Sequence, residues 1–158
     1  ISDNLKYKCN FVYSKPNYKM TGKITFTMIK PSAFEAGYTG KILAKIEEGG
    51  YRIKAMKKIR LTKEQAGLFY AEHTGKPFYE DLTTFMSSGP VVAAIVEKEN
   101  AVEAFRNFIG ATDPAKADEG TIRKLYGKNL GENAIHGSDS DESADREAGF
   151  FFSMLEIS

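Results

Sequence analysis

The sequence has very few of the residues that build disulfides and metal cages. It contains a single cysteine, Cys9, and only two histidines among 158 residues. One cysteine excludes an intrachain disulfide framework, and it also excludes a zinc site made from several cysteines. This cysteine usage is typical of a reducing compartment.

Long apolar runs are also missing. The longest useful charge-free apolar stretch covers residues 89–96, far short of the roughly 20 apolar residues that span a bilayer. Residues 1–19 are polar and have no hydrophobic centre, unlike a secretory signal. We therefore expect a cytoplasmic protein with no membrane partner.

Charge of one sign is not in excess. The sequence has 22 Lys and Arg residues against 21 Asp and Glu residues, a formal net charge of +1. General nucleic-acid binding needs a concentrated basic face that neutralises phosphates, so we expect no specific nucleic-acid partner. With 8 tyrosines and 11 phenylalanines, the chain has enough large apolar side chains to form a core rather than remain disordered.

The length indicates one domain. Residues 1–19 carry four lysines against one aspartate and have no hydrophobic periodicity. We interpret residues 1–19 as an N-terminal extension outside the domain, and residues 20–158 as the domain itself, with Met20 a plausible start.

The hydrophobic periodicity alternates along the chain between that of β-strands and that of α-helices. Strands are predicted over residues 23–29, 51–60, 91–96 and 133–136, and helices over 39–48, 62–73, 79–87, 100–109, 119–126 and 139–150. This order favours an α/β sandwich with a ferredoxin-like, antiparallel four-stranded sheet and helices packed on one face. A doubly wound parallel sheet is the alternative, but no Gly-x-Gly-x-x-Gly occurs and residues 37–41 lack the spacing of a Walker motif.

The two histidines lie in different local settings. His73 falls at the predicted end of a helix, where a cap favourable to the helix dipole is the simplest interpretation. His136 is followed by Gly137, which allows a sharp backbone turn, and then by polar residues that can cap the next helix. This setting allows the His136 ring to project into a cleft.

Cationic and hydroxyl side chains accompany the apolar elements. Lys30, Arg106 and Arg123 each follow or lie within an apolar segment, and Thr112 follows Gly110 in a loop. Phosphoryl transfer needs such donors, because charge spreads over three equatorial oxygens of the moving group. Each cation taken alone is more often a surface charge.

Several motifs together resemble the nucleoside diphosphate kinases. Residues 133–140, NAIHGSDS, are similar to the signature of that family around its phosphorylated histidine. Supporting matches lie at residues 27–31, 69–73, 76–78, 89–90, 110–114 and 120–123, and the resemblance covers residues 21–152. It implies the ferredoxin-like fold and transfer of the terminal phosphate of a nucleoside triphosphate, typically ATP, to a nucleoside diphosphate.

The resemblance also assigns the reacting groups. It implies a ping-pong route in which His136 becomes a phosphohistidine, Lys30 contacts the transferred phosphate and the ribose, and Tyr70 positions that phosphate. Glu147 would orient the imidazole, with Ser138 fixing the Glu147 carboxylate. The alternative is a catalytically silent nucleotide-binding scaffold of the same fold.

The nucleotide contacts follow from the same resemblance. Phe78, which is otherwise either a core residue or a flat platform, would stack on the base. Arg106, Thr112 and Arg123 would hold the phosphates, and Asn133 would bond a ribose hydroxyl. Mg²⁺ would ride on the nucleotide phosphates and touch Asp139 through water. The family works as a hexamer or a tetramer, so a homo-oligomer is expected.

Overall fold

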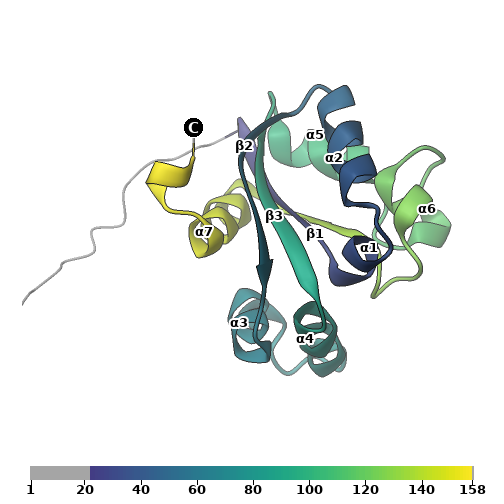
Figure 1. Ribbon diagram of the computed structural model, residues 1–158, viewed down its shortest axis with the longest axis vertical. Coiled ribbons are helices and arrows are strands. Elements are labelled where there is room, and N and C mark those ends of the chain that lie inside the picture. The colour runs from purple at the N-terminus through teal and green to yellow at the C-terminus, as the bar shows by residue number, and fades with distance from the viewer. Residues whose placement is uncertain (1–21, 158) are drawn as a thin grey trace, which may run out of the picture.

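A four-stranded antiparallel sheet forms the centre of the protein (Figure 1). The computed structural model describes residues 22–157, so the predicted N-terminal extension and Cys9 lie outside the described residues. The strands are β1 (Ile24–Ile29), β2 (Arg52–Arg60), β3 (Pro90–Glu97) and β4 (Ile135–Gly137), in the order β2-β3-β1-β4. All three pairings are antiparallel, as predicted for a ferredoxin-like sheet.

Seven α-helices and three 3₁₀-helices connect and cover the strands within residues 22–157. The α-helices are α1 (Pro31–Glu35), α2 (Thr39–Glu48), α3 (Lys63–Phe69), α4 (Tyr79–Ser87), α5 (Ala101–Ile109), α6 (Ile122–Tyr126) and α7 (Asp141–Phe151). The 3₁₀-helices are η1 (Ala71–His73), η2 (Pro114–Lys116) and η3 (Met154–Glu156). No helix in this part of the chain is both long and apolar enough to cross a membrane.

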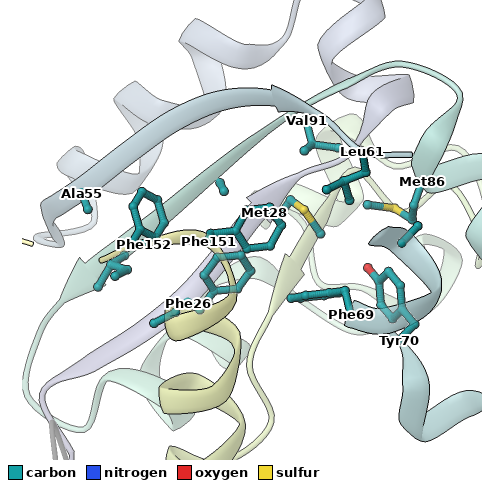
Figure 2. Close-up of a cluster of buried hydrophobic side chains, with 14 of the residues drawn as sticks. Phe26, Met28, Ala55, Leu61, Phe69, Tyr70, Met86, Val91, Phe151 and Phe152 are labelled. Carbon is teal, nitrogen blue, oxygen red and sulfur yellow. The ribbon is translucent and has the colours of Figure 1, made fainter. Parts of the chain in front are cut away.

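Helices cover both faces of the sheet, which corrects the prediction of one covered face. On one face, Phe26 and Met28 of β1 pack with Phe69 and with Phe151 of α7 (Figure 2). On the other face, residues of α2 and α5 pack over β1 and β3. In Figure 1, α7 lies on one side of the sheet and α2 and α5 lie on the other. Every residue of β1 is buried, and a strand can only be buried in this way when both faces are covered.

The segment after β2 departs from its predicted single helix. Thr62 caps α3, because its hydroxyl accepts from the Gln65 N–H while the Gln65 side chain accepts from the Thr62 N–H. The helix then ends at Phe69 instead of reaching His73, and the backbone continues as η1. The break lets Phe69 and Tyr70, which would diverge by about 100° on one helix, both pack in the core. His73 therefore caps no α-helix.

Gly137 serves packing rather than a turn. It belongs to β4 and lacks a positive φ, which corrects the predicted sharp bend. A Cβ at this position would lie 3.0 Å from Ile109 Cδ1 and 3.1 Å from Phe105 Cδ1. The missing side chain thus lets α5 approach the strand that carries His136.

We predict that Gly137→Ala destabilises the protein by about 1–3 kcal/mol, because overpacking forces Phe105 and Ile109 out of place. Urea denaturation measures the change. The matched control is Gly149→Ala in α7, where a new Cβ meets nothing within 4 Å, so we expect a gain of about 0.4–1 kcal/mol. Equal effects of the two substitutions would contradict this account of Gly137.

Candidate active site

The His136 ring is held between the sheet and two aromatic side chains. His136 pairs with Met28 of β1, and Thr27 Oγ1 donates to the His136 carbonyl at 2.7 Å. The rings of Phe69 and Tyr70 meet the imidazole edge-on, with centroids 5.6 and 6.3 Å away. The side chain keeps 19% of its surface exposed, so the ring is fixed on its inner side and open on another.

A buried carboxylate fixes the orientation of that imidazole. Glu147 of α7 is 3% exposed, and its Oε2 lies 2.9 Å from His136 Nε2. The same oxygen accepts a hydrogen bond of 2.6 Å from the Ser138 hydroxyl. Because an ionised carboxylate can only accept, Nε2 carries the proton and Nδ1 keeps its lone pair. Within residues 22–157, Nδ1 has no hydrogen-bond partner.

Two buried cations, Lys30 and Arg123, have no carboxylate partner among the described residues. Lys30 directly follows β1, and its backbone N–H donates to the Ala134 carbonyl next to β4. Burial, together with the nearby Arg123 charge, lowers the pKa of Lys30 to about 7. A buried positive charge without an anionic partner is costly, so this arrangement suits an anion that arrives from outside.

Backbone carbonyls anchor the Arg123 guanidinium. Its Nε and Nη2 donate to the Ile135 carbonyl, and Nη1 donates to the Gly110 carbonyl at 3.0 Å. Burial first, and the Arg106 charge second, lower the pKa of Arg123 to about 10. The group is therefore still charged at neutral pH and is held in one position.

Two buried polar atoms beside these cations lack hydrogen-bond partners within residues 22–157. They are the Tyr70 hydroxyl and Asn133 Oδ1. Burial, followed by the Glu147 charge, raises the pKa of Tyr70, so its hydroxyl stays protonated and can donate. The other end of the Asn133 amide donates to the Thr112 carbonyl at 3.0 Å, so Oδ1 is fixed as an acceptor. Buried polar groups normally have partners, and a bound ligand can supply both.

The remaining predicted contacts lie at the open edge of the site. Arg106 and Thr112 are exposed, and Phe78 is 49% exposed. The Phe78 ring meets His73 edge-on at 5.4 Å, and His73 stacks on Tyr70 at 6.1 Å. A line of rings therefore connects Phe78 to Tyr70 beside His136, and Phe78 is a surface residue rather than a core residue.

The residue predicted to contact a metal ion is Asp139. Within residues 22–157, no group of three or more His, Cys, Asp or Glu side chains could hold a metal ion. Asp139 is exposed, and a hydrogen bond from Ser143 is the main cause of its lowered pKa. It is therefore an ionised oxygen donor near His136, which agrees with one outer contact to a cation carried by phosphates.

Sequence reasoning missed two contributors to this site. Phe69 forms part of the wall around the imidazole, and Arg146 places Nη2 3.6 Å from Glu147 Oε1. Phe69 was noticed only as part of a motif. For Arg146, the sole sequence signal is its position beside Glu147, and that does not reveal a contact with the carboxylate.

Comparison with known proteins shows the family of the chain. The family model described as nucleoside diphosphate kinase matches residues 23–157. The chain belongs to the nucleoside diphosphate kinase family. Membership in this family confirms the resemblance noted in the sequence. The nucleoside diphosphate kinase of Chlorobium limicola is 59% identical over 133 residues, 84% of this chain and 95% of the relative. That of Persephonella marina is 54% identical over 138 residues, 87% of this chain and 99% of the relative.

Solved structures of the family share the fold. The nucleoside diphosphate kinase of Aquifex aeolicus superposes with a TM-score of 0.84 at 47% identity, covering 86% of this chain and 99% of its own. The enzyme from Halobacterium salinarum, solved in complex with CDP, gives 0.81 at 42% identity, covering 85% and 90%. The predicted ferredoxin-like fold is confirmed.

We predict that Lys30→Met stabilises the protein below pH 7 while it impairs activity. The unfolded chain carries the Lys30 charge freely up to its ordinary pKa of 10.5, whereas the folded pKa is about 7. Between these values the unfolded state binds more protons, so the parent protein gains stability as the pH rises from 7 towards 10.5. The methionine variant should therefore be favoured over the parent protein by about 3 kcal/mol more at pH 6.5 than at pH 9.5.

Urea denaturation at the two pH values measures this difference. Lys23→Met is the control, because Lys23 is exposed and its ion pair with Glu99 is 3.5 Å long. This substitution should change the free energy of unfolding little at either pH. A Lys30→Met effect that is the same at pH 6.5 and 9.5 would show that Lys30 carries no buried charge.

Proposed function

We propose that this protein transfers the terminal phosphate of a nucleoside triphosphate, typically ATP, to a nucleoside diphosphate through a phosphohistidine at His136. One observation carries the proposal. Glu147 holds Nε2 of a partly exposed imidazole, which leaves Nδ1 as the available nucleophile beside two unpaired buried cations. Phosphoryl transfer requires this combination of a positioned nucleophile and fixed positive charge.

The first half-reaction needs no base to remove a proton from the nucleophile. The Nδ1 lone pair forms a bond to the γ-phosphorus, the bond to the β–γ bridging oxygen breaks, and the diphosphate leaves with the bonding electrons. The proton on Nε2 stays there, so the ring gains positive charge that the Glu147 carboxylate stabilises. A second diphosphate reverses these steps and regenerates His136.

The surrounding donors match the charge that moves. Lys30 and Arg123 offset the negative charge on the phosphoryl oxygens, and the carbonyls that anchor the Arg123 guanidinium mean that this group needs little reorganisation during transfer. The unpartnered Tyr70 hydroxyl can donate to the same oxygens. Arg106 and Thr112 hold phosphates from the open edge in this proposal.

The rest of the nucleotide is held with little selection for the base. Phe78 offers a flat ring, and stacking tolerates every base. Asn133 Oδ1 accepts a hydrogen bond from a ribose hydroxyl in this arrangement. The structure of the Halobacterium salinarum relative with CDP supports nucleotides as the ligand class.

Magnesium and self-association complete the proposal. Mg²⁺, bound by the substrate phosphates and reaching Asp139 through water, would neutralise phosphate charge. We expect a cytoplasmic homo-oligomer, a hexamer or a tetramer, and light scattering of the purified chain distinguishes these two states from a monomer.

We predict that brief exposure to ATP adds one acid-labile phosphate to the peptide that contains His136. Mass spectrometry at alkaline pH detects it, and adding a nucleoside diphosphate removes it. His136→Ala should lower phosphate exchange at least about a thousandfold, because the nucleophile is lost.

His73→Asn is the control, because His73 is the only other histidine in the sequence. It should leave the His136 phosphate in place. Nucleotide binding without labelling would favour the silent scaffold instead, and full exchange by His136→Ala would overturn the proposed route.

A further inference from the structure

We propose that Arg146 is a positioning residue for His136 that acts through Glu147 and sets the pH range in which the imidazole can be phosphorylated. This inference rests on the proposed function of His136. Arg146 lies on the outer side of the carboxylate and need not touch the nucleotide. Its role follows from how the two oxygens of Glu147 are used.

The two carboxylate oxygens of Glu147 have different partners. Oε2 accepts hydrogen bonds from His136 and Ser138, and Oε1 lies 3.6 Å from Arg146 Nη2. The carboxylate is almost fully buried, with 4% of the side chain exposed. A buried carboxylate with one oxygen unpaired is costly, so the Arg146 charge stabilises Glu147 in the position in which Oε2 accepts from the ring.

The guanidinium is itself held by a different part of the chain. Arg146 Nη1 donates to the Phe69 carbonyl at 3.3 Å, and Nη2 lies 3.2 Å from Glu72 Oε2. Phe69 ends α3 and Glu72 lies in η1, so Arg146 joins α7 to the segment that supplies Phe69 and Tyr70. One side chain therefore fixes both the orienting carboxylate and the aromatic wall of the imidazole.

The positive charge of Arg146 has a predictable electrostatic effect. It reduces the attraction of the Glu147 carboxylate for a proton on the imidazole, and so favours the neutral ring that attacks phosphorus. Removing the charge should make the ring hold a second proton more firmly, so less nucleophile is available on the acid side. The other titratable or charged groups at the site lie on the elements packed around it: Lys30 after β1, Tyr70 before η1, Glu72 of η1, which pairs with Arg146, Arg106 of α5, Arg123 of α6, and Asp139 after β4.

The test compares Arg146→Gln with Arg146→Lys by the rate of His136 phosphorylation in a single turnover, at saturating ATP, from pH 5.5 to 9. We expect Arg146→Gln to lower the phosphorylation rate about tenfold at pH 6 and less than about threefold at pH 8.5. This is the size of effect expected when a neighbouring charge is removed. Arg146→Lys keeps the charge near Glu147, so its phosphorylation rate on the acid side of the pH profile should be close to that of the parent protein.

Arg52→Gln is the matched control. It removes the same charge from an exposed position at the start of β2, opposite Glu97 and separated from β4 by two strands. We expect its pH profile to superimpose on that of the parent protein. A merely structural role for Arg146 would lower the rate of Arg146→Gln equally at every pH, and that result would overturn the inference.

Other outcomes are also decisive. If His136 of the parent protein is phosphorylated and Arg146→Gln keeps the parental profile, this inference fails and the proposed function stands. The inference also fails if Arg146→Lys shows the same acid-side loss as Arg146→Gln. If the parent protein itself is never phosphorylated, the proposed function fails and the inference falls with it.

Discussion

The hydrogen bond between Glu147 Oε2 and His136 Nε2 is the interaction on which the rest of the site depends. It fixes the position of the ring proton, and so leaves the lone pair on Nδ1, which is the nucleophile in the proposed function. Its 2.9 Å length is maintained by the Ser138 hydroxyl on the same oxygen. Both partners are positioned by tertiary structure, since β4 carries the histidine and α7 carries the carboxylate.

The same site carries a cost to stability. Lys30 and Arg123 are both 7% exposed, and neither has a carboxylate partner within residues 22–157. The Tyr70 hydroxyl and Asn133 Oδ1 are buried without partners in the same part of the chain. Such unsatisfied groups are destabilising, and in the proposed function a phosphate and a ribose hydroxyl supply their partners. Local rules of stability are commonly broken where function requires it.

The fold was largely predictable because its signals are local. The apolar run at residues 91–96 predicted strand β3, and the pattern that begins at residue 62 predicted the start of α3. The number of covered faces was nevertheless predicted wrongly, although that apolar run contained the signal for two. Helix α1 was not predicted, because its five residues, which begin with Pro31, are too few to show a clear periodicity.

The site was predictable only in part. Residue types at motif spacing indicated His136 and its neighbours, but the burial of Lys30 and Arg123 depends on segments distant in sequence. The contact between Arg146 and Glu72 spans 74 residues, and no local pattern records it. The role of Gly137 could not be predicted from local sequence either. A glycine is needed there because α5 approaches closely, and not because the backbone of Gly137 adopts an unusual conformation.

The most direct test of the central claim is to identify the ring nitrogen that carries phosphate. The protein is labelled with ¹⁵N-histidine, phosphorylated with ATP and examined by NMR for coupling between phosphorus and nitrogen. The structure predicts phosphate on Nδ1 of His136, with the Nε2 proton retained towards Glu147. Phosphate on Nε2 would contradict the account, because it would require the Glu147 hydrogen bond to break.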